Sequence, residues 1–374
     1  MHSAQPAERQ RELDPWHMRR ALALAEQGQG RVEPNPMVGC VIARGAEIIG
    51  EGWHARFGGP HAEVVALEIA GARAAGAVMY VTLEPCCHHG KTPPCTGAIL
   101  AAGVREVVVA QQDPFPRVAG GGIAALRAAG VRVDVGVLEA EARRLNAPYR
   151  KLLAEQRPWM IAKWAMTLDG KLATSTGASR WISGEASRQI VHQLRGRVDA
   201  ILIGRGTAEA DDPMLTARPA GPRVAARIIV DTRASLSVNS QLVRTARQYP
   251  MIVAASADAP EENVDRLTVA GCEVLRLAGA DHAARLDALL AELGKRQMTN
   301  VLVEGGSELL GALADAGQID EAHAFIAPKY VGGAAAMSPL GGAGVEDMAQ
   351  AWRLSTPTIE IVDGDVYVHG HVKR

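Results

Sequence analysis

The sequence has little net charge, few aromatic residues and few cysteines, and each shortage excludes a class of protein. The net charge is −1 over 374 residues, and no run of lysines and arginines forms the basic face that a broad nucleic-acid surface needs. Aromatic residues make up only 4% of the chain, which disfavours stacking platforms for single-stranded nucleic acid. A small phosphorylated substrate, which needs only a few local arginines, is compatible with this composition.

Long apolar runs are also absent. No window reaches about 18 consecutive apolar residues, so the sequence predicts no membrane-spanning helix. The first 14 residues are polar and lack the apolar core of a secretory signal, so we expect residues 1–14 to be a flexible N-terminus. The five cysteines are too few for a disulfide scaffold, yet Cys86, Cys87 and Cys95 crowd into ten residues. This grouping indicates a metal site in a reducing compartment, and hence a cytoplasmic protein.

The length predicts more than one domain, because single domains typically span roughly 100–200 residues. Strand and helix patterns alternate along both halves of the chain, which is typical of layered α/β domains. The best linker is the polar segment 155–158, where Pro158 stops a long charged helix. We therefore expect a first domain over residues 15–154 and a second over residues 159–374.

Helices and strands are predicted from the spacing of apolar residues and from the glycines and prolines that end each segment. In the first half, helices are predicted over residues 15–27, 61–75, 96–102, 123–129 and 139–154, and strands over 37–43, 47–53, 78–83, 106–110 and 131–135. In the second half, strands are predicted over residues 159–166, 199–203, 227–230, 251–254, 273–275, 300–303 and 366–371, with a helix over 283–293.

Two segments of the first half carry the chemistry. One is the His61-Ala-Glu63 triplet, and the other runs from Cys86 to Cys95. A catalytic zinc site uses three protein ligands and leaves the fourth position for water, and one histidine with two cysteines supplies that set. Zinc lowers the pKa of a bound water from about 16 to about 7, so hydroxide becomes available to attack a ring carbon that bears an amino group. We predict His61, Cys86 and Cys95 as the metal ligands.

Glu63 lies two residues after His61, near the start of a predicted helix, where it can reach the water without binding the metal. A carboxylate there can take the proton of the attacking water and pass it to the leaving ammonia. The zinc-deaminase signature is H-x-E followed by P-C-x-x-C. Here eight residues separate the two cysteines instead of two, which narrows the family. Glu63 is the predicted catalytic residue.

A purely structural zinc site is the main alternative, since such sites have four closed ligands. Cys87 or His88 could supply the fourth. Free buried cysteines without a metal explain the pattern less well, because three cysteines and two histidines share one loop beside an H-x-E triplet. The ordered combination favours catalysis.

The sequence resembles the bifunctional deaminase/reductase family of riboflavin biosynthesis over nearly its whole length, roughly residues 15–372. The first half carries NPMVGC at 35–40, HAE at 61–63 and the long segment 82–95, whose insert HHGKTPP separates this family from cytidine and transfer-RNA deaminases. The second half carries AMTLDGK at 165–171, ADDP at 210–213 and VEGG at 303–306.

This resemblance implies an N-terminal cytidine-deaminase-like three-layer α/β/α domain and a C-terminal dihydrofolate-reductase-like α/β domain. It also implies two reactions on a small phosphorylated pyrimidine. The first domain deaminates 2,5-diamino-6-ribosylamino-4(3H)-pyrimidinone 5′-phosphate with zinc, and the second reduces the ribosyl group to a ribityl chain with NADPH. Members of the family are usually dimers or tetramers, so we expect a homo-oligomer.

On the deaminase side, the resemblance implies substrate contacts at Asn35, His54, His88 and Lys91. An amide can recognise ring donors and acceptors, and the histidine or lysine can meet a phosphate or ring oxygen. Two positions depart from the family pattern. Phe115 stands where asparagine is usual, and Cys87 stands where serine is commoner; we expect Cys87 not to bind the metal.

The second half lacks the G-x-G-x-x-G fingerprint after its first strand, so an ordinary Rossmann domain is not supported. Its useful feature is Glu304-Gly-Gly-Ser307 between a predicted strand and a helix, where glycines let backbone N–H groups approach a phosphate. A plain strand–helix turn is the alternative. Asp169-Gly170 is similarly interpreted only as a turn.

By resemblance, two sets of residues surround the reductase site. Cofactor contacts are expected at Ala165, Trp181, Thr207, Asp211, Thr232, Gly306, Ser307, Glu308, Leu309, Leu310, Gly311 and Ala312. Contacts to the reductase substrate are expected at Ser179, Arg195, Leu215, Arg218 and Glu304. The arginines suit a 5′-phosphate, because a guanidinium binds it through two hydrogen bonds. The sequence identifies no catalytic acid in this domain.

Three other functions compete with the two-step enzyme. A deaminase with an inactive reductase half would release ammonia without oxidising NADPH. A nucleic-acid-editing deaminase would show salt-dependent binding to single-stranded RNA, which the balanced charge disfavours. A zinc-stabilised binding protein without chemistry would keep its function after Glu63→Gln.

Overall fold

The computed structural model describes residues 6–88, 93–116 and 118–373. The chain divides into two compact units, Met1–Glu155 and Gln156–Arg374, and each is described by itself. No helix in the described part of the chain is long and apolar enough to cross a membrane.

The first unit is built on a five-stranded sheet with the order β2-β1-β3-β4-β5. Its strands are β1 (Gly39–Arg44), β2 (Glu47–Trp53), β3 (Val78–Val81), β4 (Glu106–Val109) and β5 (Arg132–Val135). β1 and β2 form an antiparallel hairpin, which turns at Gly45 with a φ of 59°. β3, β4 and β5 run parallel to one another, so their carboxyl ends share one edge of the sheet.

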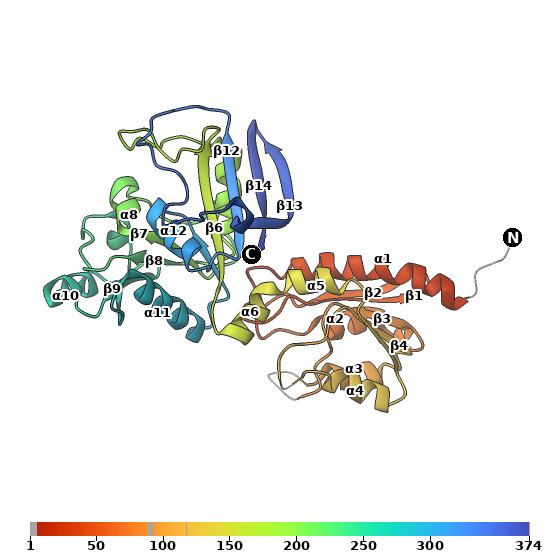
Figure 1. Ribbon diagram of the computed structural model, residues 1–374. Coiled ribbons are helices and arrows are strands. Elements are labelled where there is room, and N and C mark those ends of the chain that lie inside the picture. The colour runs from red at the N-terminus through yellow and green to blue at the C-terminus, as the bar shows by residue number, and fades with distance from the viewer. Residues whose placement is uncertain (1–5, 89–92, 117, 374) are drawn as a thin grey trace. The chain divides into compact units, whose positions relative to one another are not determined.

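Helices cover both faces of this sheet (Figure 1). They are α1 (Pro6–Glu26), α2 (Ala62–Ala70), α3 (Cys95–Ala101), α4 (Gly121–Ala128), α5 (Glu139–Leu145) and α6 (Ala147–Glu155), with a 3₁₀ turn, η1, at Gly71–Ala74. One core cluster joins α2, α3 and α4 to one face, through residues such as Ala66, Ile99 and Leu126. A second cluster joins α1 and α5 to the other, through residues such as Leu22 and Ala142. This is the expected three-layer α/β/α arrangement.

Two helix boundaries differ from the sequence-based expectation. α1 begins at Pro6, so much of the segment expected to be flexible is helical; it is rich in alanine, glutamate, arginine and glutamine, which favour helices. The single helix expected over residues 139–154 is two helices, α5 and α6, which break at Asn146. The Asn146 side chain forms two buried hydrogen bonds with the backbone of Met37, of 2.8 and 2.9 Å.

The second unit contains a nine-stranded sheet with the order β10-β9-β8-β7-β11-β6-β12-β14-β13. Its strands are β6 (Trp159–Thr167), β7 (Ala200–Gly204), β8 (Ala226–Val230), β9 (Met251–Ser256), β10 (Glu273–Leu277), β11 (Asn300–Val303), β12 (Glu321–Ala327), β13 (Arg353–Val362) and β14 (Asp365–Lys373). In this order, every strand from β10 at one edge through β12 runs parallel to its neighbours. β14 pairs antiparallel with β12, and β13 pairs antiparallel with β14 at the other edge.

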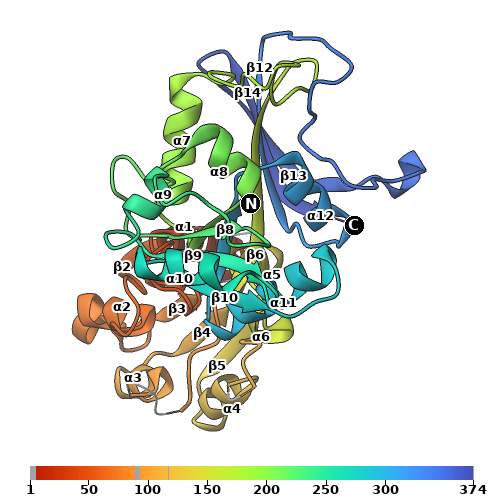
Figure 2. The ribbon, with the colours of Figure 1, turned by 90° about the vertical axis from the view of Figure 1, so that its left-hand side faces the viewer.

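Helices lie on both faces of the parallel part. They are α7 (Glu185–Arg195), α8 (Arg205–Asp211), α9 (Gln241–Arg244), α10 (Glu261–Val269), α11 (His282–Lys295) and α12 (Ser307–Asp315), and η2 is a short 3₁₀ turn at Met348–Gln350. Leu194, Ala208, Leu242 and Leu267 pack α7 to α10 against one face. The leucines of α11 and α12 pack against the other. Figure 2 shows α7 and α8 on one side of β6 and α12 on the other.

The sequence pattern did not predict β12 or β13. β13 is the edge strand and is largely exposed, with Pro357 inside it, so it has neither an apolar run nor a clean alternation. β12 combines Glu321 and His323 with apolar residues, so it has no long apolar run. The two polar side chains of this strand pair with each other, because His323 Nε2 lies 2.8 Å from Glu321 Oε1.

Candidate active sites

The three predicted metal ligands come from three separate elements of the first unit. His61 is the N-cap of α2, Cys86 lies in the loop after β3, and Cys95 opens α3. Their ligand atoms all lie within 4.8 Å of one another, and no other such group occurs among the described residues. The distance from His61 Nδ1 is 3.2 Å to Cys95 Sγ and 3.6 Å to Cys86 Sγ.

These distances fit a zinc ion. In a tetrahedral site, Zn–N bonds of about 2.0 Å and Zn–S bonds of about 2.3 Å place a nitrogen and a sulfur ligand about 3.5 Å apart. In the absence of a metal the two thiols share a proton: hydrogen bonds from Cys95 and His61 lower the pKa of Cys86, whereas the contact with Cys86 and burial raise the pKa of Cys95. Cysteine binds a metal as the thiolate, so the site favours the binding form of the Cys86 sulfur.

Glu63 lies in the first turn of α2 beside the three ligands and is only 3% exposed. Burial raises the pKa of its carboxyl group, while the nearby His61 opposes the rise. A buried carboxyl with a raised pKa is suited to exchange protons near neutral pH. The structure therefore brings an acid–base group next to the only three-ligand cluster in its described part.

A chain of hydrogen bonds orients Asn35 in the same site. His54 Nδ1 lies 2.9 Å from the carbonyl oxygen of Pro60, which can only accept, so this nitrogen carries the proton. Burial lowers the pKa of His54, which favours the neutral ring. His54 Nε2 is then an acceptor, and it lies 3.3 Å from Asn35 Nδ2. The amide oxygen of Asn35 is left to meet a donor on a bound molecule.

Three further residues were singled out for the deaminase site, and the structure describes two of them, His88 and Cys87. His88 Nδ1 is buried and has no hydrogen-bond partner among the described residues, so it can serve a ligand. Its ring lies 6.3 Å from that of Phe115, centre to centre. Cys87 stands outside the three-ligand group, near Gly121. Lys91 lies outside the described residues.

Glu84 is a residue of this site that sequence reasoning missed. Its side chain is buried and accepts hydrogen bonds from four backbone N–H groups, those of Asp113, Gly120, Gly122 and Ile123, at 2.9 to 3.2 Å. Glu84 therefore ties the loop that holds Cys86 to the segment that carries Phe115. A glutamate directly after a buried strand was the signal, because such a charge needs buried partners.

The second site is a pocket of about 1640 Å³ at the carboxyl ends of the parallel strands. This volume exceeds the roughly 300–1,000 Å³ of ordinary ligand pockets, so it can hold a dinucleotide and a substrate together. All five expected substrate residues line it. The expected cofactor residues that line it are Ala165, Trp181, Thr207, Asp211, Thr232, Gly306, Ser307, Glu308, Leu309 and Leu310. Gly311 and Ala312 do not, and Gly311 packs closely on Gly341 instead.

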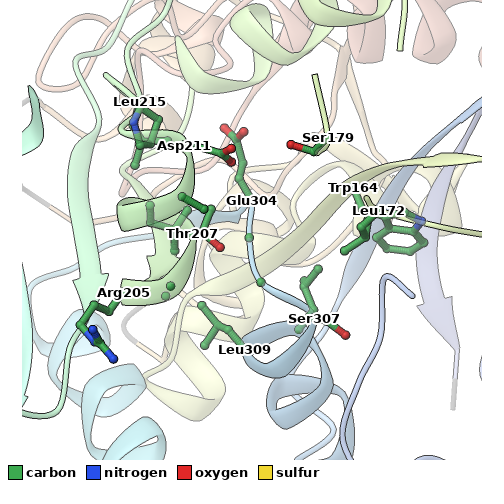
Figure 3. A pocket seen from close by; sticks show the side chains of 18 of the residues that line it. Trp164, Leu172, Ser179, Arg205, Thr207, Asp211, Leu215, Glu304, Ser307 and Leu309 are labelled. Carbon is green, nitrogen blue, oxygen red and sulfur yellow. The ribbon is translucent and has the colours of Figure 1, made fainter. Parts of the chain in front are cut away.

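Glu304 stands at the centre of the pocket, where its side chain points toward Asp211 and Ser179 (Figure 3). It forms a two-pronged ion pair with Arg195, of 2.5 and 2.8 Å, and Lys163 Nζ lies 3.9 Å away. Burial alone would raise the pKa of Glu304, but Arg195 and Lys163 outweigh it and lower the pKa. Burial lowers the pKa of Lys163, against the attraction of Glu304.

Lys163 is the second residue that sequence reasoning missed. It stands in the middle of β6, a central strand whose neighbours in sequence are mostly apolar. A lone lysine within a buried strand is the signal that could have found it, because lysine is almost never buried without a partner. It lines the pocket beside Glu304.

Arg195 and Arg218 differ in their surroundings. The guanidinium of Arg195 is occupied by Glu304, whereas Arg218 is exposed at the pocket rim. His192 lies near both arginines, and its pKa is lowered by burial and by their charges. Of the two, Arg218 is the cation available to an incoming phosphate.

A cradle for a phosphate lies where β11 meets α12. A side chain at Gly305 would lie 2.9 Å from Thr207 Cγ2, and Gly306 has a φ of 75°, so neither position tolerates a larger residue easily. Ser307, Glu308 and Leu309, in the first turn of α12, line the pocket, and the N–H groups of a first turn have no partner within their own helix. This geometry suits the diphosphate of a dinucleotide.

Asp169, interpreted above only as a turn, has defined contacts. It accepts hydrogen bonds from Thr167 Oγ1 at 2.6 Å and from the backbone of Gly332 at 2.8 Å. It therefore fixes the loop after β6 to the segment after β12.

Comparison with known proteins agrees with both halves of this description. Residues 11–111 match the family model of the cytidine and deoxycytidylate deaminase zinc-binding region. Residues 158–366 match the model of the RibD C-terminal domain. The two matches fall in the two compact units.

Whole-chain relatives cover both units together. The riboflavin biosynthesis protein RibD of Actinobacillus pleuropneumoniae is 41% identical, over 94% of this chain and 93% of the relative. The protein of the same name from Escherichia coli strain K12 is 39% identical, over 95% and 98%.

Solved structures agree over the same length. Acinetobacter baumannii RibD superposes with a TM-score of 0.85 at 36% identity, covering 97% of this chain and 99% of the other. A diaminohydroxyphosphoribosylaminopyrimidine deaminase/5-amino-6-(5-phosphoribosylamino)uracil reductase from Thermotoga maritima superposes with a TM-score of 0.82 at 34% identity, covering 96% and 98%. The chain therefore belongs to the RibD family of bifunctional deaminase/reductases of riboflavin biosynthesis.

Proposed function

We propose that His61, Cys86 and Cys95 hold one zinc ion and that Glu63 moves the protons of the deamination. The observation that carries this is the convergence of the three ligand atoms within 4.8 Å. When bound, zinc supplies a Lewis acid that lowers the pKa of water. Glu63 takes one proton from the attacking water and gives it to the ring nitrogen. It then takes the second proton, from the hydroxyl that becomes the carbonyl, and gives it to the amino group, which leaves as ammonia. Its buried carboxyl holds each proton in turn between acceptance and delivery.

The substrate is 2,5-diamino-6-ribosylamino-4(3H)-pyrimidinone 5′-phosphate. Asn35 accepts a hydrogen bond from a ring donor through its amide oxygen, because His54 holds its amide nitrogen. His88 meets the substrate through Nδ1, which has no hydrogen-bond partner among the described residues. Lys91 is assigned to the phosphate by family resemblance alone.

In the second unit, NADPH supplies the hydride that converts the ribosyl group to a ribityl chain. Gly305 and Gly306, directly before α12, would hold its diphosphate. Opening the sugar ring also requires a proton on the ring oxygen. Lys163 is placed to hold that proton, and Arg195 keeps Glu304 ionised beside it. Arg218 binds the 5′-phosphate as a charge-assisted pair.

One experiment tests both reactions. The purified protein is incubated with the diaminopyrimidinone ribotide, with and without NADPH, while ammonia and the nicotinamide absorbance are followed. Ammonia should appear in both samples, and NADPH should be consumed only after ammonia has formed. Ammonia release without NADPH oxidation would overturn the reductase half of the proposal.

We also propose a cytoplasmic location and self-association. All five cysteines are free, as expected in a reducing compartment. The balanced charge favours a small-molecule substrate over nucleic acid. A dimer or tetramer is expected from family resemblance, and light scattering on the purified protein measures its mass.

A further inference from the structure

The placement of the cofactor, which rests on the proposed function, gives the reductase pocket two distinct ends. The nicotinamide must lie beside the side chains that face the substrate. These are Lys163 on β6 and Glu304, which follows β11. The diphosphate cradle at Gly306 lies next along the pocket. The adenosine half must therefore reach toward β8, where Thr232 lines the pocket.

Two arginines flank this adenosine end. Arg205 opens α8 directly after β7, and Arg233 follows Thr232 after β8. β7 and β8 are neighbouring parallel strands, so both residues lie at the same edge of the sheet. Both line the pocket. Figure 3 shows Arg205 on the opposite side of the view from Trp164, with Thr207 and Ser307 between them.

An acidic residue at the end of a strand commonly binds the ribose hydroxyls and so favours NADH over NADPH. Asp231 occupies that place after β8, but it is 2% exposed and turned into its own loop. Its carboxylate accepts hydrogen bonds from the Leu236 N–H at 2.8 Å and from Ser235 Oγ at 3.2 Å. Asp231 Oδ1 also lies 3.9 Å from Arg205 Nε. The Asp231 carboxylate is thus held by its own loop and by Arg205, and is not exposed to the ribose.

We infer that Arg205 and Arg233 bind the 2′-phosphate of the cofactor and thereby select NADPH over NADH. The two guanidiniums contribute unequally. Arg205 contacts Glu209 at 2.7 and 2.9 Å and Asp231 at 3.9 Å, and these two carboxylates offset its charge. The Arg233 guanidinium forms no ion pair within the described residues, so its charge is available to an incoming dianion. Arg233 therefore carries the larger part of the discrimination.

Direct binding tests this without turnover. Dissociation constants of NADPH and NADH are measured by calorimetry on the whole protein, for wild type, Arg233→Gln, Arg205→Gln and the double variant. Arg244→Gln, which removes an exposed arginine of α9 that does not line the pocket, is the matched control. Adenosine 2′,5′-bisphosphate and 5′-AMP serve as fragments that carry or lack the distinguishing phosphate.

Arg233→Gln should weaken NADPH binding about ten- to a hundredfold, since a hydrogen bond to a charged group contributes about 1.5–3 kcal/mol. NADH and 5′-AMP binding should not change, which also shows that the variant is folded. Arg205→Gln should also weaken the binding of NADPH and not of NADH, but by a smaller factor. Equal weakening of NADPH and NADH, or unchanged NADPH binding in the double variant, would overturn the inference. If wild type binds neither dinucleotide, the reductase assignment itself fails.

Discussion

Replacing Glu304 by glutamine should stop the reductase and leave the deaminase intact. The carboxylate forms two hydrogen bonds with Arg195, of 2.5 and 2.8 Å, and both side chains are largely buried, with 5% and 14% exposed. Glutamine has the same shape but only one acceptor atom and no charge. The substitution therefore leaves the Arg195 guanidinium without its counter-ion in the floor of the pocket.

Removing one partner of a buried ion pair typically destabilises a protein by about 3 kcal/mol or more. The ionised carboxylate also makes this contribution depend on pH. The pKa of Glu304 is lowered in the folded unit, so its stabilisation is complete above the ordinary pKa of a glutamate, about 4.3, and is lost as the pH falls through its lower folded value. Glu304→Gln should therefore be less stable than wild type at neutral pH and should approach it in acid.

Two measurements separate stability from chemistry. Hydrogen exchange read at β11 and α7 reports the local loss, and the ammonia and NADPH assays report each reaction. Glu261→Gln is the control, because it removes only an exposed ion pair with Arg276, which contributes little. Persistent NADPH oxidation in Glu304→Gln would refute the role of this carboxylate. Loss of ammonia release would refute the independence of the two sites.

Three further changes address the first unit. Glu63→Gln should keep zinc, measured by elemental analysis, but slow ammonia release at least about a hundredfold; an active variant would remove Glu63 from the mechanism. Cys95→Ser should lose zinc and ammonia release together, whereas full zinc occupancy would exclude Cys95 as a ligand. Asn146→Ala leaves the N–H and C=O of Met37 buried without partners, so urea unfolding should show a loss of about 2–4 kcal/mol, and the KM for deamination should rise; an unchanged midpoint would contradict this.

The grouping of His61, Cys86 and Cys95 was predictable because the residues lie beside strong local signals. His61 directly precedes a helix, and Cys95 follows two prolines that end a loop. The family, the α/β class of both domains, the two activities and the two cofactors were inferred from such motifs and are confirmed by the whole-chain comparisons. The roles of individual site residues remain predictions.

Contacts between distant residues were not predictable. Asn146 and Met37 lie 109 residues apart, as do Arg195 and Glu304. Each pairing depends on how a helix is rotated against its sheet, and a single sequence contains no signal for that rotation. The break in the helix expected over residues 139–154 is different, because it has a local signal. Pro148 lies inside that span, and proline is tolerated in the first turn of a helix but not in its interior.

Residues that directly follow parallel strands were predictable in part, because a simple rule of sheet geometry brings them together. The carboxyl ends of neighbouring parallel strands share one edge, where α/β sheets bind their ligands. Once β7, β8 and β11 are recognised as parallel neighbours, Arg205, Arg233 and Glu304 must converge on one pocket. What the rule leaves open is which arginine is already neutralised. That distinction depends on side-chain contacts, such as the pairing of Arg205 with Glu209, and it decides where a second phosphate binds.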